Sequence, residues 1–361
     1  MKRTSIILSL LALTAACGPN PALENEAQQP MPQPSAAPST PPTTPAASDA
    51  GATGPAAANQ PSPEDKKKAE ERAALEKDRA AMTESNDKEK ARWTPELKAS
   101  SKALTEKSFP TGKAAIEAAM ASKSRRPGRA ERDKYRHPAE TLDFFGFKPT
   151  MSVLEYGPGE GWYIELLAPA LAKKGHLYAT NGDPNGPADE RSTFYAQRFK
   201  SFLDIAPEVY GKVETVQIDG KAPNLGMQDK LDMVLVMRGL HGMQNAGKLD
   251  EWLKTINAAL KPGGILGIEE HRAKPDADPV ESSKKGYLPE KWVIERIEAN
   301  GFKLAGKSEI NANPKDTKDY ADGVWALPPT YRQGEKDHDK YAAIGESDRM
   351  TLKFTKVAPK K

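Results

Sequence analysis

Cysteine is nearly absent from this chain, with Cys17 alone among 361 residues. A single cysteine excludes internal disulfides and thiolate-bound zinc, and we predict no metal site. Hydrophobic residues make up only 37% of the sequence, and they are unevenly spread, which indicates one core and long solvated segments. The formal net charge is only +3, so composition gives no case for a nucleic-acid partner or an acidic membrane surface.

Long apolar runs are also lacking. The run Ile6–Leu13 is too short to span a bilayer comfortably. It follows Lys2 and Arg3 and precedes small residues, which is the pattern of a signal peptide over residues 1–16. Cys17, directly after those small residues, resembles the lipobox of bacterial lipoproteins. The resemblance implies a lipidated Cys17 and an exported protein, anchored to a bacterial membrane on its periplasmic side only through acyl chains. An ordinary signal peptide with an incidental cysteine is the alternative.

The next ninety residues contain few large apolar side chains. Residues 17–63 are rich in Pro, Ala, Ser, Thr and Gln, so we predict a disordered linker. Residues 64–107 carry Glu and Lys at helical spacing, with too few apolar positions for a coiled-coil seam. We expect a solvated helical stalk that sets the distance from the membrane, with a partner-binding coiled coil as the weaker alternative. The folded domain is predicted over residues 108–361.

Strands and helices alternate through this domain, which predicts right-handed βαβ units and a parallel sheet. The expected strands are 151–155, 175–180, 212–218, 231–237, 265–269, 302–310 and 350–356. The main expected helices are 113–120, 137–145, 161–173, 187–206, 249–260 and 292–299.

The first of these strands ends in an acid, and three glycines follow at alternate positions, giving E-x-G-x-G-x-G from Glu155 to Gly161. Glycines permit positive φ and close approach of a ligand to the backbone. The start of the following helix favours a negative group such as a phosphate or carboxylate. The dinucleotide fingerprint G-x-G-x-x-G needs a third glycine where Trp162 stands, which disfavours an NAD-type site.

This pattern resembles motif I of the class I S-adenosylmethionine-dependent methyltransferases, and the likeness extends over residues 108–357. Acidic strand ends, the L-K-P-G-G turn before the fifth strand and the late pair of strands agree with it. A closer likeness, to exported bacterial predicted methyltransferases, lies in Tyr135–Thr141 and Glu346–Leu352. The resemblance implies an α/β, Rossmann-like, seven-stranded and mostly parallel sheet with a late antiparallel edge hairpin and helices on both faces.

The resemblance also implies the cofactor, S-adenosylmethionine, and its contacts. Glu155 would meet the ammonium group of the cofactor, directly or through water. Its carboxylate would be lined by Gly157, Gly159 and Gly161. The position that holds an acid for the ribose is Asn181 here, so the ribose contact is assigned to Asp183, two residues on. Asp219 would approach the adenine amino group; a turn or helix-capping aspartate is the alternative reading.

Candidate groups for the acceptor follow the fourth and fifth strands, where ligands of such sheets bind. His241 and His271 are candidate general bases, or structural hydrogen bonders, and Arg238 or Arg272 would hold an anionic acceptor. The Asn-Pro-Pro-Tyr type signature of some amino methyltransferases is absent after the fourth strand. The acceptor is expected to be a small or unknown molecule, and the sequence does not give the oligomeric state.

Two further segments bear on the substrate. Arg126, Arg129, Arg132 and Arg136 would face an anionic substrate or form a solvated face, and a local charge run favours the solvated face. The segment 311–346 is long for a strand connection, which predicts a lid or substrate wall.

Three functions remain open on these residues. An exported, lipid-anchored methyltransferase is favoured by the acid and all three glycines. A catalytically silent binding or assembly module that kept the fold is favoured by Asn181. An NAD-type oxidoreductase is disfavoured by Trp162.

Overall fold

A computed structural model describes residues 62–357; the signal-peptide, lipidation and linker predictions at residues 1–61 therefore lie outside the described residues. The helices are α1 (Pro63–Arg92), α2 (Pro95–Thr105), α3 (Gly112–Met120), α4 (Asp133–Arg136), α5 (Pro138–Phe145), α6 (Ile164–Leu171), α7 (Arg191–Ile205), α8 (Pro207–Tyr210), α9 (Leu240–Asn245), α10 (Leu249–Ala259), α11 (Pro279–Ser283), α12 (Glu290–Glu298) and α13 (His338–Ile344), with short 3₁₀ helices η1 (Arg129–Arg132) and η2 (Gly323–Ala326). The strands are β1 (Ser152–Tyr156), β2 (His176–Asn181), β3 (Val213–Gln217), β4 (Leu231–Met237), β5 (Leu260–His271), β6 (Phe302–Ser308) and β7 (Arg349–Lys356).

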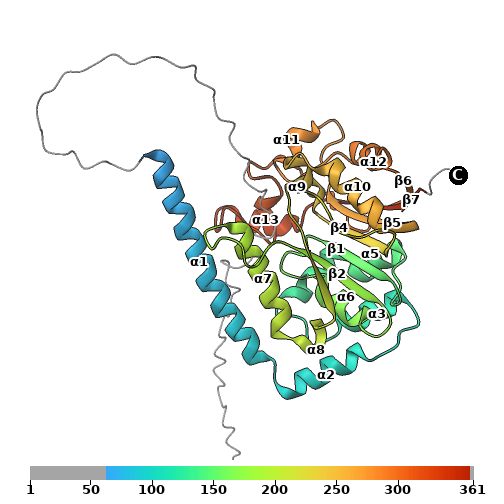
Figure 1. The fold of residues 1–361 in the computed structure, drawn as a ribbon. Helices are drawn as coiled ribbons and strands as arrows, with labels where there is room; N and C mark the ends of the chain where they lie inside the picture. Colours follow the sequence, from blue (N-terminus) through green and yellow to red (C-terminus); the bar gives the residue numbers. More distant parts are fainter. Residues whose placement is uncertain (1–61, 358–361) are drawn as a thin grey trace, which may run out of the picture.

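The strands form one seven-stranded sheet in the order β3-β2-β1-β4-β5-β7-β6 (Figure 1). The first five are parallel, and β7 runs antiparallel to both β5 and β6. Strands β2 and β3 lie on one side of β1, and β4 and β5 lie on its other side. The carboxyl ends of β1 and β4 therefore adjoin the switch point in strand order, where such sheets bind ligands. The predicted fold class is confirmed.

Helices cover both faces of the sheet, because alternate strand residues point to opposite sides. Val153 of β1 belongs to a core packed against α3, α5 and α6, whereas its neighbour Leu154 belongs to a core packed against α10 and α12. The central strand β4 is apolar at nearly every position and is buried from both sides, as a strand inside a parallel sheet must be.

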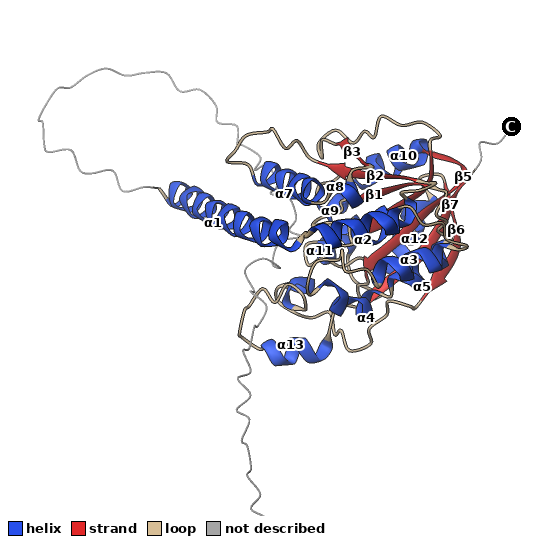
Figure 2. Cartoon of the chain, turned by 90° about the horizontal axis from the view of Figure 1, so that it is seen from below, coloured by secondary structure: helices blue, strands red, loops and turns tan. Residues whose placement is uncertain are grey.

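The charged helix predicted over residues 64–92 is present as α1, but it does not stand apart from the domain. Both views show it running beside α7 (Figures 1 and 2). Arg79 donates hydrogen bonds to Gln197 and to the carbonyl of Ala188, and Asp78 accepts one from Arg191. Exposed ion pairs contribute little to stability. Trp93, which directly follows α1, is buried in the core and attaches the end of the helix to the domain. α1 is therefore part of the domain and not a solvated helix apart from it, while its role in setting the distance from the membrane stays a prediction.

Element boundaries differ from the prediction at two informative places. β5 begins at Leu260, directly after α10, so the K-P-G-G residues predicted as a turn lie within β5. α6 begins at Ile164 instead of residue 161, because residues 160–163 form turns that follow the glycine corner.

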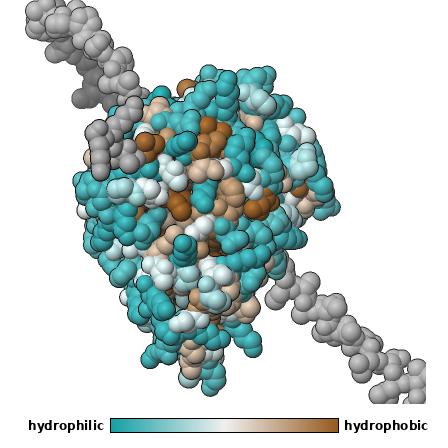
Figure 3. All heavy atoms as spheres, turned by 90° about the vertical axis from the view of Figure 1, so that its right-hand side faces the viewer, coloured by the Kyte–Doolittle hydropathy of each residue, from teal (hydrophilic) through white to brown (hydrophobic). Residues whose placement is uncertain are grey.

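The connection between β6 and β7 is ordered and has small cores of its own. Trp325 packs with Tyr287, and Leu327 packs with Tyr341. The face that Figure 3 shows is mainly hydrophilic, with scattered hydrophobic patches. Among the described residues, no helix has the length and apolar character needed to cross a membrane.

Candidate functional site

The sharp corner after β1 takes the form that its glycines predict. Gly157, Gly159 and Gly161 have φ values of 61°, 57° and 80°, a region that other residues rarely adopt. A Cβ built on Gly157 would meet no atom within 4 Å, so the backbone there borders open space. The main chain at Gly157 is therefore open to close approach by a ligand.

The third glycine has a different use. A Cβ on Gly161 would lie 2.5 Å from the ring of Phe202, so this position serves the packing of α7 against the corner. Gly161 is absent from the cavity lining, while Gly157 and Gly159 are part of it. The amide of Gly157 donates to Thr180 at 2.8 Å, so that N–H is already committed within the protein.

Glu155 ends β1 at this corner and is 3% exposed. Its Oε2 has no hydrogen-bond partner in the described part of the chain, which is costly for a buried carboxylate. Burial raises its pKa to about 8, and the positive charges of Arg238 and Arg136 only partly oppose that rise. The site therefore holds a buried acceptor that lacks a donor, and a cationic ligand group would supply one.

A cavity of about 370 Å³ opens in front of Glu155. Its walls come from the glycine corner, from the carboxyl ends of β4 and β5, from residues 126–136, from the C-terminal half of α1 and from residues 324–330. Its size falls at the small end of the range for ligand sites. The wall predicted within 311–346 is present, since Trp325 and Thr330 line the cavity.

The basic segment faces inward, which corrects the solvated face that its sequence favoured. Arg126, Arg129, Arg132 and Arg136 all line the cavity. Arg136 is 5% exposed, stacks over Trp162 at 4.6 Å, and donates through Nε to Glu346. Arg132 donates to the same carboxylate at 2.8 Å. Glu346 lies far away in the sequence, so a local charge pattern could not reveal this partner.

Arg238 directly follows β4 and is buried, with 8% of its surface exposed. It donates from Nη1 to Glu269 at 2.9 Å, and Glu269 also accepts from Tyr163 at 3.0 Å. Burial is the largest single influence on Arg238 and lowers its pKa, but Glu269, Tyr163 and Glu346 together outweigh burial and hold the arginine pKa above its usual value. The sequence prediction that Arg238 faces the acceptor is consistent with its place in the cavity wall.

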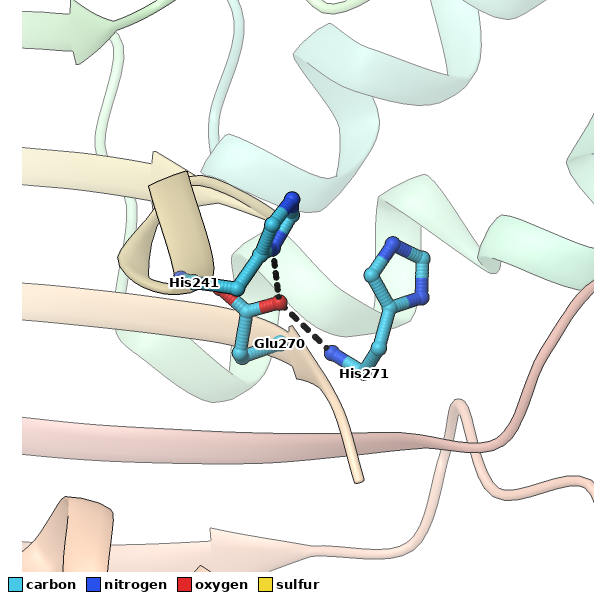
Figure 4. Close-up of side chains that lie close together, drawn as sticks. All are labelled: His241, Glu270 and His271. Carbon is cyan, nitrogen blue, oxygen red and sulfur yellow. Dashed lines mark hydrogen bonds and ion pairs between the residues drawn. The ribbon is translucent and has the colours of Figure 1, made fainter. Parts of the chain in front are cut away.

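The two histidine candidates lie together, with Glu270 between them (Figure 4). The carboxylate of Glu270 accepts from the His241 ring at 2.9 Å and from the backbone amides of Leu240, His241 and His271. The three side chains have possible metal-ligand atoms within 4.8 Å of one another. Because four N–H donors already occupy Glu270, we read it as a brace between α9 and β5.

Only His271 of this pair lines the cavity. Its Nδ1 meets the hydroxyl of Ser347, another lining residue. Burial, followed by the charges of His241 and Arg238, holds the pKa of His271 well below its usual value, so its ring is neutral at pH 7.

The family model described as "Methyltransferase domain" matches residues 129–302, just under half of the chain. Residues 129–302 are therefore similar to a methyltransferase domain. The comparison with curated proteins found no match.

Solved structures similar to this chain include several proteins of low sequence identity. A SAM-dependent methyltransferase from Aquifex aeolicus is 19% identical, with 63% of this chain and 93% of that chain covered and a TM-score of 0.41. A TehB-like SAM-dependent methyltransferase from Corynebacterium glutamicum is 17% identical, with 61% of this chain and 86% of that chain covered and a TM-score of 0.36. The [4+2]-cyclase SpnF is 16% identical, with 70% of this chain and 98% of that chain covered and a TM-score of 0.44.

S-adenosylmethionine is the methyl donor of such a methyltransferase domain, and the residues at the corner fit it. The unpartnered carboxylate of Glu155 matches an ammonium group, and the open backbone at Gly157 allows the amino-acid part to come close. Burial strengthens such a charge pair, since little water screens it.

The residues predicted to hold the nucleoside lie apart from this cavity in the methyltransferase domain. Asp183 and Asp219 are exposed, and each caps a turn by accepting from the amide two residues on. Asn181 donates to the carbonyl of Ala196. None of the three lines the cavity, so the structure favours the turn reading for both acids and adds no support for their cofactor contacts.

Arg272, the second predicted anion holder, also lies outside. It is bound by Glu309 at 2.6 Å, with Glu290 and Asp348 nearby. Sequence reasoning missed Glu346, Trp162 and the end of α1 as parts of the site, because each reaches the cavity only through tertiary packing.

Proposed function

We propose that this protein transfers the methyl group of S-adenosylmethionine to an acceptor held in the cavity in front of β1, β4 and β5. The observation that carries the proposal is Glu155. The Oε2 atom of its buried carboxylate accepts no hydrogen bond from residues 62–357, and the side chain lies at the glycine corner in the same cavity as Arg238 and His271.

The cofactor supplies a methyl group activated by the adjacent sulfonium, so the work of the chain is mainly alignment. Glu155 holds the ammonium end. Trp325 and Tyr163 form walls that keep water from the space between donor and acceptor. If the methylated atom carries a proton, the neutral ring of His271 is placed to receive it, whereas His241 is turned toward Glu270.

Calorimetry on the full chain with S-adenosylmethionine, S-adenosylhomocysteine and NAD tests the proposal. Both sulfur ligands should bind, NAD should not, and Glu155→Gln should weaken the sulfur ligands at least tenfold, the loss of one buried charge-assisted contact. Glu251→Gln is the matched control, because Glu251 is an exposed acid paired only with Lys248. Failure of both sulfur ligands to bind would reject a methyltransferase.

A silent binding module is the second candidate, and the nucleoside side of the site favours it. Asn181 and Asp183 are engaged in local contacts where the family uses an acid for the ribose. Ligand binding without transfer of labelled methyl groups to any acceptor in a lysate of a bacterium that carries the protein would support this alternative.

We further propose that the protein is exported and held at the periplasmic side of a bacterial membrane by lipid on Cys17. The support is the sequence of residues 1–17 alone. Because Cys17 is the single cysteine, Cys17→Ser should abolish incorporation of labelled palmitate and release the protein from the membrane fraction. Unchanged labelling or membrane association in the variant would reject the anchor.

A further inference from the structure

The cavity of the methyltransferase domain contains more positive than negative side chains. Seven lysine or arginine side chains line it, and four glutamates oppose them. The cationic residues are Lys88, Arg92, Arg126, Arg129, Arg132, Arg136 and Arg238. The cofactor cannot balance this excess, because its one carboxylate is outnumbered by an ammonium and a sulfonium. Two of the seven cations have carboxylate partners behind the wall, Arg129 with Glu165 at 3.6 Å and Arg238 with Glu269 at 2.9 Å. Arg132 and Arg136 share one carboxylate, Glu346, and a negatively charged molecule would balance the charge that this sharing leaves over.

Hydrogen-bond donors in the cavity wall that have no acceptor also indicate an anionic ligand. Four lining side chains have a buried polar atom without a hydrogen bond, and three of these atoms are donors: Arg129 Nη1, Arg238 Nε and Trp325 Nε1. The single acceptor among the four is Glu155 Oε2. The indole N–H of Trp325 is decisive, since Trp325 is only 4% exposed and comes from the predicted substrate wall.

Arg132 and Arg136 add unused donors at the same cavity. Each contacts Glu346 through Nε, and the terminal nitrogens of both guanidinium groups donate no hydrogen bond to any residue in the range 62–357. Burial lowers the pKa of Arg136 well below its usual value, and repulsion from Arg132 and Arg238 lowers it further. This excess positive charge is the condition that an anion would relieve.

We propose that the methyl acceptor is an oxyanion, a molecule with a carboxylate or phosphate group, bound by Arg132, Arg136 and the indole N–H of Trp325. Paired N–H donors on a planar guanidinium match the two oxygens of either group. The inference rests on the proposed methyltransferase function and names the chemical class of its acceptor.

The test measures thermal unfolding of the full chain saturated with S-adenosylhomocysteine, at constant ionic strength in Tris-chloride. Inorganic phosphate and succinate are the probes, and acetamide is the neutral comparison. At least one of the two anions should raise Tm saturably, and acetamide should not. A response to phosphate alone assigns a phosphate ester, a response to succinate alone assigns a carboxylic acid, and both outcomes support the oxyanion class.

Three variants test the assignment. Arg132→Gln and Trp325→Phe should each weaken the anion about tenfold, and Glu346→Gln should strengthen it because it removes a competing carboxylate. Arg296→Gln is the matched control, since it deletes the same charge from an exposed pair with Asp250 and should change nothing. If Arg132→Gln does not fold, Trp325→Phe decides alone, because it removes the indole N–H and keeps a smaller aromatic ring in its place.

The failures of the two proposals are distinguishable. If S-adenosylhomocysteine does not bind the full chain, the methyltransferase function itself falls. If it binds but neither anion stabilises the complex, or Arg296→Gln loses as much affinity as Arg132→Gln, the oxyanion acceptor is wrong. Loss of S-adenosylhomocysteine binding in Trp325→Phe would also overturn it, because these donors would then serve the cofactor.

Discussion

Affinity for S-adenosylhomocysteine should rise with pH because Glu155 has to ionise before it can hold the ligand ammonium. Burial places the pKa of Glu155 near 8, so at pH 6 only about one carboxyl group in a hundred is charged. Each pH unit below 7 therefore changes the charged fraction about tenfold. We expect the dissociation constant to fall about tenfold between pH 6 and pH 7, with release of close to one proton per ligand bound.

Calorimetry in buffers of different ionisation enthalpy measures both the constant and the proton release. Glu155→Gln should bind more weakly and show neither effect, because glutamine stays neutral. Wild-type affinity that is level between pH 6 and pH 7, or the same slope in Glu155→Gln, would show that another group governs binding.

Three further outcomes follow from the same structure. The raised pKa of Glu155 contributes stability that is fully present below pH 4.5 and is lost as pH rises through 8. At pH 9, Glu155→Gln should therefore increase the free energy of unfolding of the ligand-free protein by up to roughly 5 kcal/mol and raise its Tm; a lower Tm would contradict the burial argument. Gly157→Ala and Gly161→Ala should each lose about 1–2 kcal/mol of stability through their positive φ. Gly161→Ala should lose about 1–3 kcal/mol more through the clash with Phe202, whereas only Gly157→Ala should also weaken S-adenosylhomocysteine; equal effects of the two variants in denaturation and in calorimetry would refute this division. Because the pKa of His271 is depressed, the unfolded chain binds a proton below about pH 6.5 and the folded chain does not. Nitrogen NMR of the folded protein at pH 6 should therefore show a neutral His271 ring, and a charged ring would refute this prediction.

The sheet could be predicted from the sequence because its signals are local. Residues 231–237 are apolar on both faces and lie between turn residues, and β4 occupies that span. The glycine corner could also be predicted, because three glycines at alternate positions after a strand indicate a sharp corner, and Gly157, Gly159 and Gly161 all have positive φ. The start of α6 was placed three residues early, because turns precede the helix.

The cavity wall could not be predicted in the same way. Arg132 and Arg136 are more than 200 residues from Glu346 in sequence, so a run of arginines gave no sign that it would turn inward. Likewise, α1 has almost no apolar stripe, and its place beside α7 depends on polar contacts such as Arg79 with Gln197. Asp183 and Asp219 illustrate the reverse case, where residue type and position suit both a cofactor contact and a simple turn.

The central claim is that Glu155 and the glycine corner hold the amino-acid end of the cofactor. The most direct measurement is a crystal structure of the full chain with S-adenosylhomocysteine bound. We expect the ligand ammonium within hydrogen-bond distance of the Glu155 carboxylate, with the ligand backbone against Gly157 and Gly159. A ligand bound elsewhere, or at the corner with its ammonium turned away from Glu155, would contradict it.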